Sequence, residues 1–131
     1  MSRIVLAASA ACGVLVAAYL VVVHYRGSAP VCLNSGCEIV QRSRYAELAG
    51  IPVAALGATA FALLLLSTAV RAAPVVAAAA ALALTGIVFA AYLFYVQLAV
   101  IDAVCMWCVA SDMLLLVAAG ASAFRLRSLL Q

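Results

Sequence analysis

Residues 74–98 read PVVAAAAALALTGIVFAAYLFYVQL and contain no charged side chain. A helix needs about 20 such residues to cross a hydrocarbon core of roughly 30 Å. Three other apolar stretches reach a similar length, at residues 4–24, 52–70 and 104–124. Backbone polar groups find no water in lipid, so segments that cross it are helical. The sequence therefore predicts four membrane-spanning helices.

The composition agrees with a membrane protein. Of 131 residues, 71% are hydrophobic and 8% are charged, whereas roughly a quarter of a soluble domain is charged. This length suits one domain, residues 1–131. The net charge of +3 comes from seven arginines against four acids. No basic stripe suited to nucleic acid is present, so we expect no nucleic-acid partner, and the charge bears instead on membrane orientation.

The long connection at residues 25–51 separates the first two helices. Within it, Ile39, Val40, Ser43 and Ala46 have the spacing of one helix face. We therefore predict a short surface helix over residues 38–49. The predicted fold is an all-α integral membrane bundle of four helices, with this surface helix in the first extracytoplasmic loop.

The arginines give a weak orientation signal. In the four-span arrangement, residues 3, 71, 125 and 127 fall on one side and residues 26, 42 and 44 on the other. Basic residues favour the cytoplasmic side, so we expect both termini in the cytoplasm. A cleaved signal peptide is disfavoured because the apolar run continues about a dozen residues beyond Cys12.

Four of the five cysteines form two close pairs. Cys32 and Cys37 lie in the long loop, and Cys105 and Cys108 form a C-x-x-C at the start of the last apolar run. Residues at i and i+3 share a helix face, and a helix start stabilises a thiolate. Two dithiols at one membrane rim suit disulfide exchange on an oxidising, extracytoplasmic face.

Other classes remain open at this point. Four thiolates with these spacings also suit a structural zinc site. A small multidrug transporter has about four short helices too, but such carriers resemble a family with an acid in the first helix, which is absent here. The fifth cysteine, Cys12, is expected to be a buried small hydrophobic residue.

Several sequence elements, taken in order, resemble the vitamin K epoxide reductase family. They are CEIVQRSRYA at 37–46, GIP at 50–52, LG at 56–57 and CMWC at 105–108. The resemblance covers about residues 10–120. The sequence most resembles the bacterial-type, disulfide-forming members. Because no fused thioredoxin-like domain occurs in this sequence, we expect a separate thioredoxin-like protein as partner.

The resemblance implies a four-helix bundle around a quinone of ubiquinone, menaquinone or vitamin K type. It implies that Cys105 and Cys108 are the active-site pair, with Cys108 in contact with the quinone. Cys32 and Cys37 would be the shuttle pair, and Ser43 would hydrogen-bond near the quinone and the active-site thiol. The implied activity is thiol–quinone oxidoreduction in a bacterial or archaeal inner membrane, with reduction of vitamin K epoxide as the alternative.

Two departures from the family pattern affect these expectations. Only four residues separate the loop cysteines, fewer than in many relatives. Asp112 stands where a neutral or aromatic residue is expected. It follows Cys108 by four residues and so shares its helix face. Because acids inside membrane helices are costly and often functional, we predict that Asp112 contacts the quinone and relays protons, with a hydrogen-bonded structural acid as the alternative.

Aromatic residues near these cysteines have simpler explanations. Trp107 lies between the paired cysteines in sequence and should point away from their face, as an interfacial anchor. Phe89, Tyr92 and Tyr95 are candidates for the pocket wall, although ordinary packing or an aromatic belt is favoured. His24, near a helix end, is expected to have no catalytic role.

Overall fold

Four helices make up most of the described part of the protein. A computed structural model describes residues 2–26, 47–48, 50–101 and 106–131. The helices are α1 (Ser2–Arg26), α3 (Val53–Ser67), α4 (Ala73–Tyr95) and α5 (Met106–Leu130). Each apolar stretch predicted to be helical is therefore helical, with bounds that differ by a few residues.

The second helix is shorter than predicted. The apolar run at 52–70 gives a helix that ends at Ser67, a length of 15 residues. At 1.5 Å per residue this is about 22 Å, less than the roughly 30 Å of a hydrocarbon core. Three helical segments are long and apolar enough to cross a membrane: Ser2–Arg26, Ala73–Ile101 and Met106–Leu130. They fit an integral membrane protein.

The two ends of α4 have different local structures. Pro74 lies in the first turn of α4, where its missing N–H is not needed for the helix. At its other end α4 continues as a π-helix, η2 (Val96–Ile101). The wider π-helical turn extends the apolar segment to Ile101, beyond the expected end at residue 98.

A small hairpin precedes α3. Strand β1 (Glu47–Leu48) pairs antiparallel with β2 (Ile51–Pro52), and Gly50 in the turn has a φ of 82°, which glycine adopts without steric cost. The surface helix predicted over 38–49 therefore does not extend through Glu47 and Leu48. Residues 38–46 lie outside the described part of the chain.

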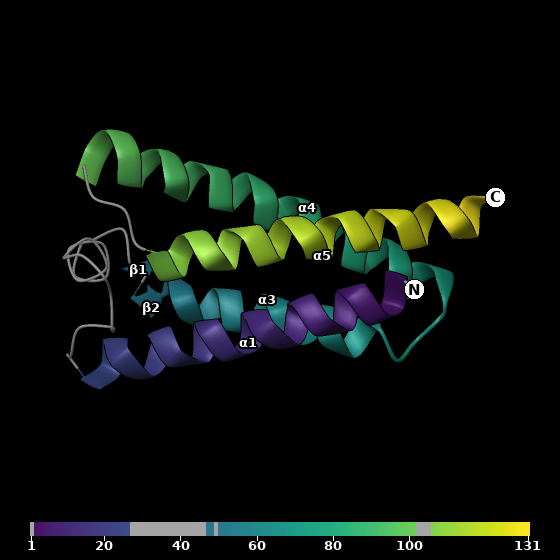
Figure 1. Cartoon of the computed structure of the whole chain (residues 1–131), viewed down its shortest axis with the longest axis horizontal. Helices are drawn as coiled ribbons and strands as arrows, with labels where there is room; N and C mark the ends of the chain where they lie inside the picture. Colours follow the sequence, from purple (N-terminus) through teal and green to yellow (C-terminus); the bar gives the residue numbers. More distant parts are fainter. Residues whose placement is uncertain (1, 27–46, 49, 102–105) are drawn as a thin grey trace.

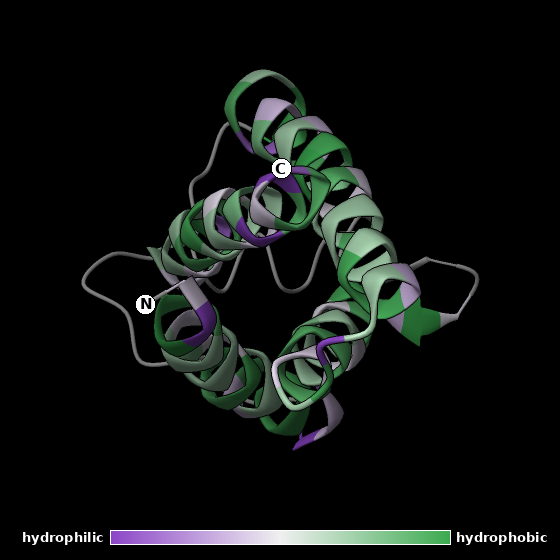
Figure 2. Ribbon diagram, turned by 90° about the vertical axis from the view of Figure 1, so that its right-hand side faces the viewer, coloured by the Kyte–Doolittle hydropathy of each residue, from purple (hydrophilic) through white to green (hydrophobic). Residues whose placement is uncertain are grey.

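The helices alternate in direction around the bundle (Figure 1). α1 and α4 run away from the end that carries both termini, and α3 and α5 run back toward it. α1 packs extensively on α3 and α5, and α4 packs on α5, whereas α3 and α4 touch less. Viewed from the terminal end, the ribbons are mainly hydrophobic (Figure 2).

The tight core occupies the half of the bundle nearest the termini. Its buried members are mostly alanines with a few larger side chains, namely Leu6, Ala10, Phe61, Leu64, Ala79, Ala83, Ala118 and Ala121. Close approach is clearest at Gly13, where an added Cβ would collide with the ring of Phe61. Small residues let membrane helices approach in this way.

Two arginines bind the C-terminal end of α3. Arg3 donates from Nε and Nη2 to the carbonyl oxygen of Thr68, at 3.0 and 2.7 Å. The buried Arg125 donates from Nη2 to the carbonyl oxygen of Val70 at 3.0 Å and from Nη1 to that of Ser67 at 3.4 Å. The last carbonyls of a helix have no partner within it, so these bonds tie α1 and α5 to the end of the short helix.

Candidate active site

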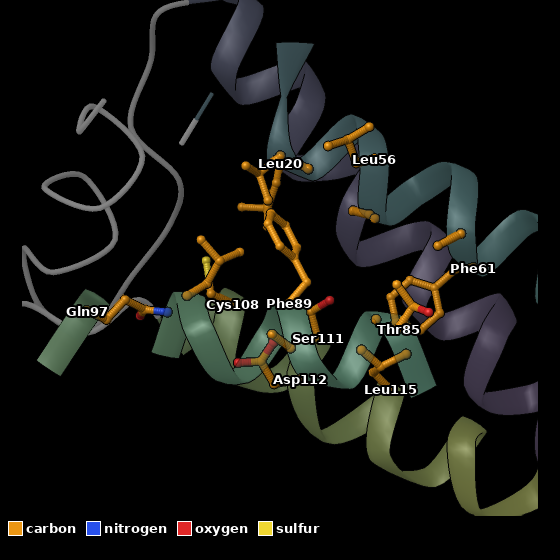
Figure 3. Close-up of a pocket in the computed structure, with 18 of the residues that line it drawn as sticks. Leu20, Leu56, Phe61, Thr85, Phe89, Gln97, Cys108, Ser111, Asp112 and Leu115 are labelled. Atoms are coloured by element: carbon orange, nitrogen blue, oxygen red, sulfur yellow. The ribbon is translucent and has the colours of Figure 1, made fainter. Parts of the chain in front are cut away.

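A cavity of about 340 Å³ lies in the half of the bundle away from the termini (Figure 3). Its wall is formed by α1, α3, α4, η2 and the first turns of α5. Most lining side chains are aliphatic or aromatic. Pockets for small molecules have this character and measure about 300–1,000 Å³.

Small residues create the space between the loosely packed α3 and α4. Gly57 of α3 lines the cavity, and a Cβ there would meet no atom within 4 Å. Gly86 of α4 lines it as well, and a Cβ there would approach the Cδ2 of Leu115 to 3.3 Å. A side chain at Gly57 would extend into open space, and one at Gly86 would press on Leu115 of α5.

Among the described residues, a few polar or reactive side chains interrupt this apolar wall: Thr85, Gln97, Cys108, Ser111 and Asp112. Three of them come from one face of α5. Cys108, Ser111 and Asp112 have the i, i+3, i+4 spacing that places side chains together on a helix. The structure thus brings Asp112 into the same cavity as Cys108, as the sequence predicted, while the chemical roles of both stay predictions.

Gln97 was not identified from the sequence. It lies in η2, is 3% exposed and lines the cavity. π-Helical turns often occur at functional sites. A primary amide within an apolar run, a few residues before C-x-x-C, was a signal that could have pointed to it, because polar groups inside the membrane are costly and usually functional.

The aromatic residues divide as follows. Phe89 lines the cavity, whereas Tyr92 and Tyr95 are 52% and 62% exposed. Trp107 is half-buried and its ring centroid lies 5.0 Å from that of Tyr19. This contact joins α1 to α5 near the cavity, and it agrees with the prediction that Trp107 points away from the face of Cys108.

Two further residues lie away from the cavity lining. Cys12 is exposed on α1, so the expectation of a buried residue is wrong. Its side chain lies on a side of α1 that no other described helix covers, although neighbouring Gly13 is buried. His24, near the end of α1, has an edge-on ring contact with Tyr25 at 5.7 Å.

Four of the predicted site residues lie outside the described part of the chain: Cys32, Cys37, Cys105 and Ser43. Their roles remain those expected from the sequence. Of the predicted site residues, the structure therefore places Cys108 and Asp112.

The cavity suits a flat apolar molecule with polar oxygens. Its wall is mainly hydrocarbon, and polar or reactive side chains are present at Gln97, Cys108, Ser111 and Asp112. The thiol of Cys108 opens on the same space (Figure 3). A two-electron acceptor held here would lie against a cysteine.

A comparison with protein families agrees with this geometry. The family model described as "Vitamin K epoxide reductase family" matches residues 4–123 of this chain. The match spans all four helices, the lining of the cavity and both cysteine pairs. The chain therefore belongs to the vitamin K epoxide reductase family and is a membrane oxidoreductase of that type.

Proposed function

We propose that this protein is a thiol–quinone oxidoreductase that oxidises a separate thioredoxin-like protein and so supports disulfide formation. The observation that carries the proposal is the position of Cys108 in the wall of an apolar cavity large enough for a quinone ring. Membership of the family supports the redox class.

The proposed electron route uses both cysteine pairs. The dithiol of the partner reduces the Cys32–Cys37 disulfide by exchange through a mixed disulfide. The loop dithiol then reduces Cys105–Cys108 in the same way. In the last step the two thiols of Cys105 and Cys108 lose two protons and two electrons and form one S–S bond, while a quinone gains both and leaves as quinol.

Individual side chains have distinct roles in this scheme. Cys108 is the thiol that faces the quinone, and the apolar wall keeps water from the reacting atoms. Asp112, one turn further along α5, holds and passes a proton to the reduced oxygen. Ser43 supplies a hydrogen bond near the quinone and the thiol, as the family resemblance implies.

The protein is proposed to reside in a bacterial or archaeal inner membrane with both termini in the cytoplasm. α3 crosses together with the three longer helices, which gives a four-span bundle. Both termini lie at one end of the bundle, and α5 begins at the other end (Figure 1). The cysteine pairs then face the extracytoplasmic side, where oxidation of protein thiols takes place.

The test is quinone reduction by purified protein in detergent or lipid, followed by quinone absorbance, with a reduced thioredoxin-like protein as donor. We expect turnover with ubiquinone-1 or menadione. Cys108→Ser should abolish turnover, and the matched control Cys12→Ser, on the exposed face of α1, should retain it.

Three results would contradict the proposal. One is the absence of turnover with every quinone, and another is full activity of Cys108→Ser. Tightly bound zinc at one ion per chain would favour the structural metal site instead. Vitamin K epoxide offered in place of quinone decides between the quinone and the epoxide as the substrate.

A further inference from the structure

We infer that Gln97 binds the substrate, with its side-chain amide donating a hydrogen bond to a carbonyl oxygen of the quinone at the Cys108 end of the cavity. This inference rests on the proposed function for the identity of the ligand. The sequence and the family resemblance gave Gln97 no role.

The first observation is its position. Gln97 and Cys108 both line the cavity, and Figure 3 shows them at the same end of it, with the amide of Gln97 directed inward from η2. The middle of the cavity lies between Phe89 and Leu56, and Phe61 and Leu115 lie toward the other end. A flat ring in this space therefore presents one oxygen to the end that carries Cys108 and Gln97.

The second observation is the backbone that presents it. The helix that begins at Ala73 changes from α to π at Val96, and the π-helix spans Val96–Ile101. Gln97 is the second residue of this π-helix and, like Val96, it is buried. Burial in a mainly hydrocarbon wall makes this amide one of the few polar groups that a ligand in the cavity can reach.

The third argument is the supply of donors. The hydroxyl of Thr85 donates to the carbonyl oxygen of Ala81 at 2.9 Å, so its proton is engaged within α4. A primary amide has two N–H donors and one carbonyl acceptor, so a contact within the protein still leaves Gln97 capacity for a ligand oxygen.

The role of such a donor extends beyond binding. As electrons pass from the thiols, negative charge grows on the quinone oxygens. A preorganised N–H directed at that position stabilises the charge more strongly in an apolar site than in water. Gln97 thus favours ligands that carry a carbonyl oxygen over hydrocarbons of the same shape.

The test compares two ligands that differ in their oxygens. Menadione has the ring carbonyls, and 2-methylnaphthalene has the same fused rings and methyl group without them. The protein has one tryptophan, Trp107, directly before Cys108. Quenching of its fluorescence reports menadione binding without turnover, and displacement of menadione reports 2-methylnaphthalene.

Gln97→Met keeps the length of the side chain and removes both donors. We expect menadione to bind about tenfold more weakly, as loss of one hydrogen bond of ordinary strength predicts, with 2-methylnaphthalene unchanged. The matched control Thr59→Val changes an exposed threonine of α3 that donates within its own helix and does not line the cavity, and it should leave both affinities unchanged. Gln97→Leu provides a second variant, since its side chain also has no donor and should weaken menadione binding.

The outcomes separate the two proposals. If Gln97→Met and Gln97→Leu bind menadione as tightly as the original protein, the role of Gln97 is wrong. An equal loss for menadione and 2-methylnaphthalene would also overturn it, because this would indicate a change in cavity shape. Carbonyl-selective binding without any quinone turnover would overturn the proposed function and leave the assignment of Gln97 intact.

Discussion

The position of Cys108 within α5 suits a reactive thiol. It is the third residue of a helix that begins at Met106, and the first N–H groups of a helix have no partner within it. A thiolate is stabilised in such a place. The same helix face carries Asp112 one turn later, so a thiol and a carboxyl group share one cavity.

Replacement of this acid tests its proposed role. Asp112→Asn preserves the shape of the side chain but leaves no carboxyl group to carry a proton. General acid–base groups contribute about a hundredfold to ten-thousandfold in rate, so we expect the single quinone-reducing step to slow at least about a hundredfold. Stopped-flow absorbance of quinone measures this step.

Asp112→Asn should leave the affinity for quinone within a few-fold of the original. Ser128→Ala, which changes an exposed residue of α5 outside the cavity, serves as the control and should keep the rate. An unchanged rate in Asp112→Asn would make Asp112 a structural acid, which is the alternative that its sequence position left open.

At the scale of elements, the contact between α1 and α3 depends on Gly13. A Cβ at this position would collide with the ring of Phe61, and overpacking of this kind costs about 1–3 kcal/mol. Gly13→Ala should therefore lower the midpoint of thermal unfolding in detergent. The matched control Gly120→Ala, where a Cβ meets nothing within 4 Å, should be neutral or slightly stabilising, since alanine favours helix.

A double variant locates the cause of that loss. If the collision with Phe61 is responsible, Gly13→Ala combined with Phe61→Ala should lose less stability than the sum of the two single changes. Additive losses in the double variant would show that Gly13 is needed for another reason.

The bonds from Arg125 to the end of α3 give a second prediction at this scale. Arg125→Met keeps the apolar stem but leaves the carbonyl oxygens of Val70 and Ser67 without this donor. One of these bonds, to Ser67, is buried and the other is partly buried, and loss of hydrogen bonds from a charged donor costs about 1–3 kcal/mol. We expect a lower unfolding midpoint, and the exposed Arg127→Met should serve as an unaffected control. Equal midpoints for the two variants would contradict a stabilising role for these bonds.

These contacts also show what the sequence could predict. Uninterrupted apolar runs were enough to locate four helices, because length and hydropathy are local properties. The end of α3, the strand at Glu47–Leu48 and the π-helix at Val96 were not predicted. The end of α3 is bound by arginines that are distant in the sequence. The strand is associated with the backbone conformation of Gly50, and the π-helix is a change of helix type that the residue pattern does not reveal.

The site shows the same division between local and tertiary information. Cys108 and Asp112 could be placed together because they are four positions apart in one helix. Gln97 could not, since its proximity to Cys108 depends on how η2 lies against α5. Burial of Cys12 was predicted from its residue type, but whether a residue on a membrane helix is exposed depends on the neighbouring helices.

At the scale of the whole molecule, packing differs between the two halves of the bundle. Alanines and the ring of Phe61 close the half nearest the termini, and glycines with a looser contact between α3 and α4 leave the cavity in the other half. One half thus holds the helices together while the other contains the cavity, and Cys108, near the start of α5, lies in the half with the cavity.

This architecture makes membrane orientation testable, with α3 as the critical element. Its 15 residues span about 22 Å, and Arg3 and Arg125 bind carbonyl oxygens at its C-terminal end and just beyond it. We therefore expect it to cross with local thinning of the bilayer. Single cysteines at Tyr25 and Ala72, both exposed, mark its two sides in a background without the five native cysteines. An impermeant maleimide should label Tyr25→Cys only from outside intact cells and Ala72→Cys only in inverted vesicles, together with the terminal control Gln131→Cys. Labelling of Tyr25→Cys and Ala72→Cys from the same side would mean that α3 turns back within the membrane, and the four-span arrangement would be wrong.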